Sequence, residues 1–182
     1  MATFVALLRG INVSGRKMIR MADLLKSFEA IGLDAARHYL QSGNIVFRSR
    51  RADVKKLASV IQARIAEDFG HNIDVLVLSA EEVDRIAASN PLFPRLGNNE
   101  TLFHATFFFQ PVSQDDFQKI KLPAQPGEQA VLIGRVLFLY CPHGYGRTKL
   151  NNAFFEKALG VPATTRNWRT VLALQALCAE DP

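Results

Sequence analysis

Cations and amides, grouped in short glycine-bearing segments, are the residues of this sequence most able to do chemistry. Arg9-Gly10-Ile11-Asn12 is followed by more cations at Arg16, Lys17 and Arg20, and a second such segment is Ser42-Gly43-Asn44. Arginine and lysine bind phosphate and carboxylate oxygens through charge-assisted hydrogen bonds. These segments therefore predict a ligand site, and its candidate ligand-binding residues are Arg9, Asn12, Lys17, Ser42 and Asn44.

Two comparable segments lie near the C-terminus, and each comes just before an expected helix. Residues 143–149 read His-Gly-Tyr-Gly-Arg-Thr-Lys, and residues 164–170 read Thr-Thr-Arg-Asn-Trp-Arg-Thr. The first N–H groups of a helix are unpaired and lie at the positive end of its dipole, so anions bind there. We expect a second ligand site here, formed by Arg147, Lys149, Arg166, Asn167 and Arg169.

Ordinary turn and capping chemistry is the alternative explanation of all these segments. Glycine allows a positive φ, and Ser and Asn side chains satisfy backbone groups in turns. Residues 164–170 could likewise cap the last helix, with Trp168 anchoring that helix in the core. Arg9 fits this explanation least well, because a cation at the end of a buried strand needs a partner. The sequence alone does not decide between ligand binding and turn or capping chemistry.

The same segments argue against several kinds of catalysis. They contain no Asp or Glu, which does not favour general acid–base hydrolysis. Residues 143–149 lack the spacing of a nucleotide-binding P-loop, and Cys141 and His143 are not followed by a second pair of zinc ligands. We therefore expect no metal and no cofactor, and the sequence leaves open whether the protein is an enzyme.

The excess positive charge lies entirely in the first half of the chain, which bears on its partners. Residues 1–79 contain 12 Lys and Arg against 7 Asp and Glu, whereas residues 80–182 contain 10 of each. A basic face attracts phosphate-bearing partners. Our first hypothesis is a binding module for a phosphate-bearing small molecule or nucleotide. The alternatives are nucleic-acid binding through the basic N-terminal half, and a structural or oligomeric protein with no ligand site.

Nucleic acid is the less favoured of the two ligand classes. The expected third strand, Asn44-Ile45-Val46-Phe47-Arg48, does not match the aromatic pattern of RNA-binding sheets, and only Phe47 could stack on a base.

Composition is that of an ordinary globular protein, with 48% apolar and 21% charged residues. Two cysteines cannot form a disulfide framework and are typical of a reducing compartment. The apolar stretch Phe4–Leu8 is far too short to span a bilayer or to act as a signal peptide. We therefore expect a cytoplasmic protein with no membrane partner, and the oligomeric state is left open.

Hydrophobic periodicity gives the elements that must position these segments. In the first half it predicts strands over residues 3–9, 37–41, 45–48 and 73–78, helices over 21–31 and 54–69, and a third helix that opens with a capping box of Ser79 and Glu82. In the second half it predicts strands over 103–109, 131–133, 136–140 and 161–165, a short helix from Ser113, a helix closed by Gly160 and a final helix containing Trp168.

Both halves therefore have the order β-α-β-β-α-β followed by an extra helix, which predicts an α+β fold of two ferredoxin-like halves. The expected divisions are residues 1–80, a connecting helix and loop over 81–102, and residues 103–182. One continuous sheet through both halves is the alternative. In each half, right-handed crossovers place the third strand antiparallel between the first two. Gly10–Asn12 should then lie beside Ser42–Asn44, and segments 143–149 and 164–170 should share one edge of the second sheet.

Three motifs in this order resemble those of a known bacterial family. They are Leu8-Arg9-Gly10-Ile11-Asn12-Val13, Gln41-Ser42-Gly43-Asn44 and Thr165-Arg166-Asn167-Trp168-Arg169-Thr170, and they run from the first strand to the last helix. The family is catalogued as domain of unknown function 1697. The resemblance implies a bacterial cytoplasmic protein with ferredoxin-like halves, and it implies no activity, since none is assigned to the family.

Overall fold

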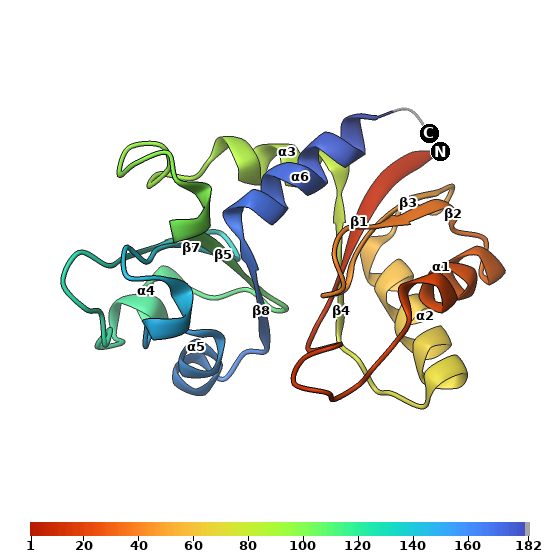
Figure 1. The fold of residues 1–182 in the computed structure, drawn as a ribbon, viewed down its shortest axis with the longest axis horizontal. Coiled ribbons are helices and arrows are strands. Elements are labelled where there is room, and N and C mark those ends of the chain that lie inside the picture. Colours follow the sequence, from red (N-terminus) through yellow and green to blue (C-terminus); the bar gives the residue numbers. More distant parts are fainter. Residues whose placement is uncertain (181–182) are drawn as a thin grey trace. The chain divides into compact units, whose positions relative to one another are not determined.

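Two similar sheets organise the chain (Figure 1). The computed structural model describes residues 1–180. They divide into two compact units, one of residues 1–85 together with the end of the chain from Ala173, and one of residues 86–172. Each unit contains one four-stranded antiparallel sheet with its own helices.

The first unit has its strands in the order β2-β3-β1-β4, and all neighbouring pairs are antiparallel. The third strand thus lies beside the first, as predicted from the crossover rule. Its elements are β1 (Ala2–Leu8), α1 (Met21–Ala30), β2 (Asp34–His38), β3 (Asn44–Ser49), α2 (Val54–Phe69), β4 (Val75–Ser79) and the start of α3 (Ala80–Ala88).

One face of this sheet is covered by both α1 and α2, as expected. Alternate residues of β1, Phe4, Ala6 and Leu8, enter a single buried cluster with Phe28 of α1 and Ile61 of α2. The predicted capping box of α3 is also confirmed, because the Ser79 Oγ accepts from the Glu82 N–H and the Glu82 carboxylate accepts from the Ser79 N–H.

The second unit repeats the order of the first, with strands β6-β7-β5-β8 and antiparallel neighbours throughout. The predicted α+β fold of two similar halves, each followed by a helix, is therefore confirmed. Its elements after α3 are η1 (Glu100–Leu102), β5 (Phe103–Phe108), α4 (Gln114–Gln118), β6 (Gln129–Ile133), β7 (Val136–Tyr140), η2 (Tyr145–Arg147), α5 (Asn152–Leu159), β8 (Ala163–Asn167) and the start of α6 (Trp168–Ala179).

The sheet of the second unit is buried on both faces. On the side of α5, Phe108, Leu137, Leu139 and Phe155 form a cluster. On the other side the fully buried Trp168 packs with its ring centroid 5.9 Å from that of Phe138. No helix of the described chain is long and apolar enough to cross a membrane.

Two predicted strands were placed wrongly, each by two or three residues. The second strand was predicted at 37–41 but lies at Asp34–His38. Residues 39–43 instead form a longer turn, in which Leu40 and Gly43 take positive φ values of 58° and 78°. The Tyr39 N–H closes this turn by donating to the Asn44 carbonyl at 2.9 Å.

The last strand was predicted at 161–165 but lies at Ala163–Asn167. It continues through polar residues because β5 offers them polar partners. Thr165 pairs with Thr106, and their hydroxyl oxygens are 2.8 Å apart. Asn167 pairs with His104 in the same way, with 3.4 Å between the side-chain nitrogens. This shift changes the geometry of the second predicted site.

Candidate functional site

The first two predicted segments meet at one edge of the first sheet, which confirms the expected convergence. The Leu8 N–H donates to the Gly43 carbonyl at 2.8 Å. The amide nitrogen of Asn12 donates to the carbonyls of Gln41, at 2.8 Å, and Ile19, at 3.0 Å, while its oxygen accepts from the Ile19 N–H. Asn12 therefore ties the loop that follows β1 to the turn that precedes β3.

Gly43 allows this close approach. A Cβ at this position would lie 2.7 Å from the Cβ of Leu8 and 3.0 Å from the Cδ1 of Ile11, and the residue has a φ of 78°. Both the space and the backbone conformation therefore exclude a larger residue. The glycine of this motif is explained by packing between the two segments.

Several of the predicted ligand-binding residues hold this edge together. Arg9 forms an ion pair with Asp74 at 3.1 Å, which gives the strand-ending cation the partner it requires. Asn44 is fully buried and donates to the Tyr39 carbonyl at 2.9 Å and to the Ser42 hydroxyl at 3.1 Å. These bonds are of the kind expected from the alternative explanation, ordinary turn chemistry. Through them the side chains of Arg9, Asn12, Ser42 and Asn44 hold the neighbouring loop of residues 10–17 in place.

That loop forms the wall of an open pocket of about 500 Å³. The pocket is lined by Gly10, Val13, Ser14, Arg16 and Lys17. The backbone of this loop is unusual. Besides Gly10 and Gly15, the non-glycine residues Asn12, Ser14 and Lys17 also have left-handed conformations, with φ values of 53°, 51° and 46°. Each such residue costs free energy and persists only where its surroundings hold it. The bonds of Asn12 supply part of that restraint.

Two cations face solvent at the pocket. Lys17 donates from Nζ to the Asn72 carbonyl at 3.1 Å. Arg16 is exposed, and its guanidinium has no hydrogen-bond or ion-pair partner among residues 1–180. Sequence reasoning selected Lys17 but left Arg16, Val13 and Ser14 out of the site. The run of cations after Gly10 was the signal that could have included Arg16.

The second predicted site is divided by the shifted strand. Arg166 and Asn167 are consecutive residues of β8, so their side chains lie on opposite faces of the sheet. Arg166 is buried with 8% of its surface exposed, and it donates to the Thr164 hydroxyl at 2.7 Å and the Thr165 carbonyl at 3.0 Å. Burial lowers the pKa of its guanidinium to about 10. The prediction that Arg166 and Asn167 lie together in a loop before the helix was wrong.

The remaining cations of that site are exposed. Strands β7 and β8 are both antiparallel to β5, so the segments after them share one edge of the sheet as expected. Arg147 and Lys149 lie on the loop after β7, and the Arg169 Nε lies 4.0 Å from the Glu100 carboxylate. With Arg166 inside the protein, the four cations do not form a single exposed cluster.

A polar network under the loop of Tyr145 was not foreseen. The rings of His104 and Tyr145 stack with centroids 4.4 Å apart, and Asn152 donates from its N–H to the Tyr145 hydroxyl at 3.2 Å. Burial lowers the pKa of His104 to about 4, so its imidazole is neutral at pH 7. The only hint in the sequence is that His104 and Thr106 alternate within an aromatic strand.

Within residues 1–180 no group of three or more His, Cys, Asp or Glu side chains could hold a metal ion. The first-unit pocket is lined by two cations, Arg16 and Lys17, whose side chains carry hydrogen-bond donors. The fold and this pocket thus define an α+β protein of two similar halves with a cationic loop site.

The chain belongs to the family described as a protein of unknown function, DUF1697, whose model matches residues 1–138. This confirms the resemblance seen in the motifs. Among solved structures the chain is similar to a conserved bacterial protein from Streptococcus pneumoniae, with 20% identity, 99% of each chain covered and a TM-score of 0.76. At this identity the likeness concerns the fold alone. A search of curated proteins gives no significant match.

Proposed function

We propose that the protein binds a phosphate-bearing small molecule or nucleotide in the pocket of residues 10–17. The observation that carries the proposal is the lining of this pocket, which contains two cations, Arg16 and Lys17, and no carboxylate. Loops that alternate left-handed with other conformations form concave sites for anions, because successive N–H groups turn toward one side. This loop has such left-handed residues, and the N–H groups of Asn12 and Arg16 already donate within it, to the carbonyls of Lys17 and Val13.

Binding here would not have to break an existing ion pair. Within residues 1–180 Arg16 is not engaged with a carboxylate, and Lys17 would exchange one neutral carbonyl acceptor, that of Asn72, for a charged oxygen. Arginine can hold a phosphate through two parallel N–H bonds, and lysine adds a point charge. The ion pair of Arg9 with Asp74 and the bonds of Asn12 would hold the loop in place while the ligand is bound.

A small ligand is favoured over a nucleic acid by the distribution of charge. The pocket of about 500 Å³ is within the range of small-molecule sites. Another pair of adjacent cations of the first unit, Arg50 and Arg51, follows β3 at the opposite end of the sheet, where Ser49 pairs with Ala2. Nucleic-acid binding through the basic half remains the alternative, and its signature is a steep dependence on salt.

The second unit keeps a weaker proposal of the same kind. Arg147, Lys149 and Arg169 are exposed and follow two strands that end at the same sheet edge, so they could contact an anion together. Asn167 would contribute indirectly, because its side-chain oxygen accepts the Arg169 N–H at 2.9 Å and thereby fixes the start of α6.

The test is a melting-temperature screen of phosphorylated metabolites and nucleotides at constant ionic strength. A ligand present at about 100 times its dissociation constant should stabilise the protein by about 2.7 kcal/mol. We expect Arg16→Gln to weaken binding about tenfold, since a hydrogen bond to a charged group contributes about 1.5–3 kcal/mol. The matched control is Arg50→Gln, an exposed arginine of the same unit outside the pocket.

Equal effects of the two substitutions would contradict the proposal, because they would indicate a general charge effect. A ligand whose binding is weakened by Lys149→Gln and not by Arg16→Gln would move the site to the second unit.

A further inference from the structure

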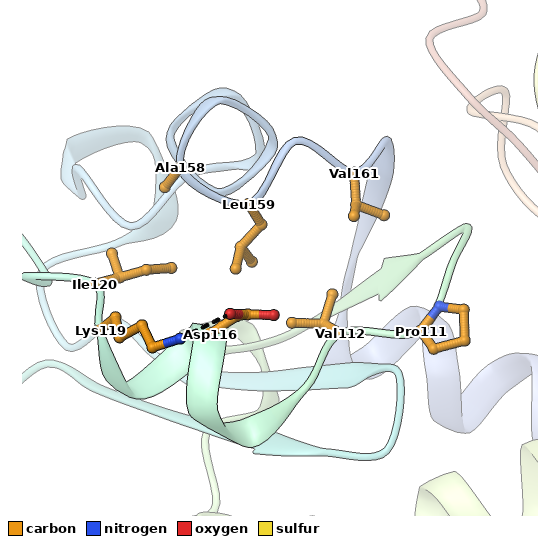
Figure 2. Close-up of a pocket in the computed structure, with 8 residues that line it drawn as sticks. All are labelled: Pro111, Val112, Asp116, Lys119, Ile120, Ala158, Leu159 and Val161. Carbon is orange, nitrogen blue, oxygen red and sulfur yellow. Dashed lines mark hydrogen bonds and ion pairs between the residues drawn. The ribbon is translucent and has the colours of Figure 1, made fainter.

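A second pocket lies in the other unit, away from all the predicted motifs (Figure 2). It has a volume of about 490 Å³ and is walled mainly by apolar side chains on the segments around α4 and α5. In Figure 2, Leu159 points from the end of α5 toward the Asp116–Lys119 pair on the α4 side. The apolar lining residues are Pro111, Val112, Ile120, Ala158, Leu159 and Val161.

One ion pair supplies the only charges of this lining. The Lys119 Nζ lies 3.3 Å from an Asp116 carboxylate oxygen, and the two side chains are 75% and 64% exposed. The other Asp116 oxygen accepts from the Ser113 hydroxyl at 2.7 Å. An ammonium has three N–H donors and a carboxylate about four acceptor sites, so both groups can still bind a ligand.

We propose that this pocket binds a small zwitterion with an apolar body, the chemistry of an apolar amino acid. An ammonium group of the ligand would lie on Asp116 and a carboxylate on Lys119, while the apolar part enters the cleft against Leu159 and Val112. A ligand with a single charge would be attracted by one member of the pair and repelled by the other. A zwitterion matches both, because its two charges are as close together as those of the pair.

The pocket also meets the general conditions for a small-molecule site. Such sites measure about 300–1,000 Å³ and combine apolar walls with a few polar groups that fix the orientation of the ligand. Here the walls can remove the apolar body from water, while the charged ends stay at the exposed rim. Because the rim is exposed, most of the affinity should come from the apolar part and most of the selectivity from the charges.

The test is a titration of the whole protein with leucine, followed through the methyl resonances of Val112, Ile120, Leu159 and Val161. The first-unit core methyls of Ile61 and Ile65 serve as an internal control. We expect saturable shifts at the pocket methyls alone, with a dissociation constant in the millimolar range. N-acetyl-leucine lacks the ammonium, leucine amide lacks the carboxylate and serine lacks the apolar body. Each should bind at least about fivefold more weakly than leucine, which corresponds to about 1 kcal/mol.

Variants separate the two parts of the proposal. Ala158→Phe at an exposed lining position should fill the cleft and abolish the shifts. Lys119→Gln should remove the preference for leucine over leucine amide, and Lys157→Gln, an exposed lysine of α5 outside the lining, should leave it unchanged. Unchanged methyl resonances of Val136 and Val171, which are buried in the second unit outside the lining, would show that each variant is folded.

Two results would overturn the proposal on the unmodified protein. One is the absence of saturable shifts at the pocket methyls with leucine. The other is equal affinity for leucine and its two singly charged analogues, which would make the cleft a site for apolar groups without recognition of a zwitterion.

Discussion

Acid should weaken the folding of the second unit through one buried histidine, His104. Its side chain has 6% of its surface exposed, and Nδ1 has no hydrogen-bond partner among the described residues. The Asn167 amide lies 3.4 Å from Nε2, which can accept from it only while the imidazole is neutral. Protonation would place two donors face to face and bury a charge, and burial accordingly lowers the pKa from 6.5 to about 4.

The direction and size of the effect follow from this pKa. The unfolded chain binds the proton below about pH 6.5, whereas the folded chain binds it only near pH 4. Stability is therefore fully present above the unfolded pKa and falls as the pH drops from 6.5 toward 4. Between about pH 7.5 and about pH 4.5 the loss from this group alone comes to about 2.5 kcal/mol.

Urea denaturation followed by the fluorescence of the single tryptophan, Trp168, measures this loss in the same unit. Because carboxylates also titrate in this range, the quantity to compare is the pH dependence of His104→Gln against that of the unmodified protein. The variant should lose about 2.5 kcal/mol less on acidification. His143→Gln, which replaces an exposed histidine of the same unit, should behave like the unmodified protein. Parallel profiles for all three proteins would refute the reasoning.

Three further substitutions test the packing that supports the sites. Gly43→Ala should destabilise the protein by about 2–4 kcal/mol, because the new Cβ meets Leu8 and the backbone is left-handed; the same change at Gly15, where space is open, should cost only about 1 kcal/mol. Trp168→Ala should cost about 3–5 kcal/mol in urea denaturation followed by circular dichroism, since this variant lacks the single tryptophan. Arg166→Ala should cost about 1–3 kcal/mol, since Thr164 and Thr165 lose a buried donor, and a fully stable Arg166→Ala variant would contradict its structural assignment.

Much of the fold could be predicted from hydrophobic periodicity and turn residues. The helices around Leu24, Phe28, Ile61 and Ile65 were found because their apolar residues recur at helical spacing and face one sheet. Once the element order was known, the crossover rule placed the third strand between the first two, and so brought Asn12 to the turn of residues 39–43.

The strand boundaries that failed lie where polarity misled the pattern. Arg166 and Asn167 were assigned to a loop because they are polar, yet their partners Ala105 and His104 lie opposite them on β5. Such pairing joins residues far apart in the chain, so no local window contains it. The error had a large consequence for the predicted second site. Successive side chains of a strand point to opposite faces of the sheet, and in β8 the side chain of Arg166 is buried.

The meeting of the two first-unit segments was predicted correctly, but the side chains that line the pocket beside them were not. The left-handed backbone at Ser14 and Lys17 is not a local preference of these residue types, and it coexists with the long-range bonds of Asn12. Without that backbone, the pocket that makes Arg16 a candidate could not be anticipated. Asn44 and Arg9, in contrast, were selected for their chemistry and turned out to hold the edge together.

The most direct test of the proposed function is a backbone amide NMR titration with the best phosphorylated ligand from the melting-temperature screen. We expect saturable shifts at the amides of residues 10–17, with little change at residues 147–149. These shifts should be lost in Arg16→Gln and kept in Arg50→Gln. Shifts that are absent from residues 10–17, or that survive Arg16→Gln unchanged, would contradict the proposed function.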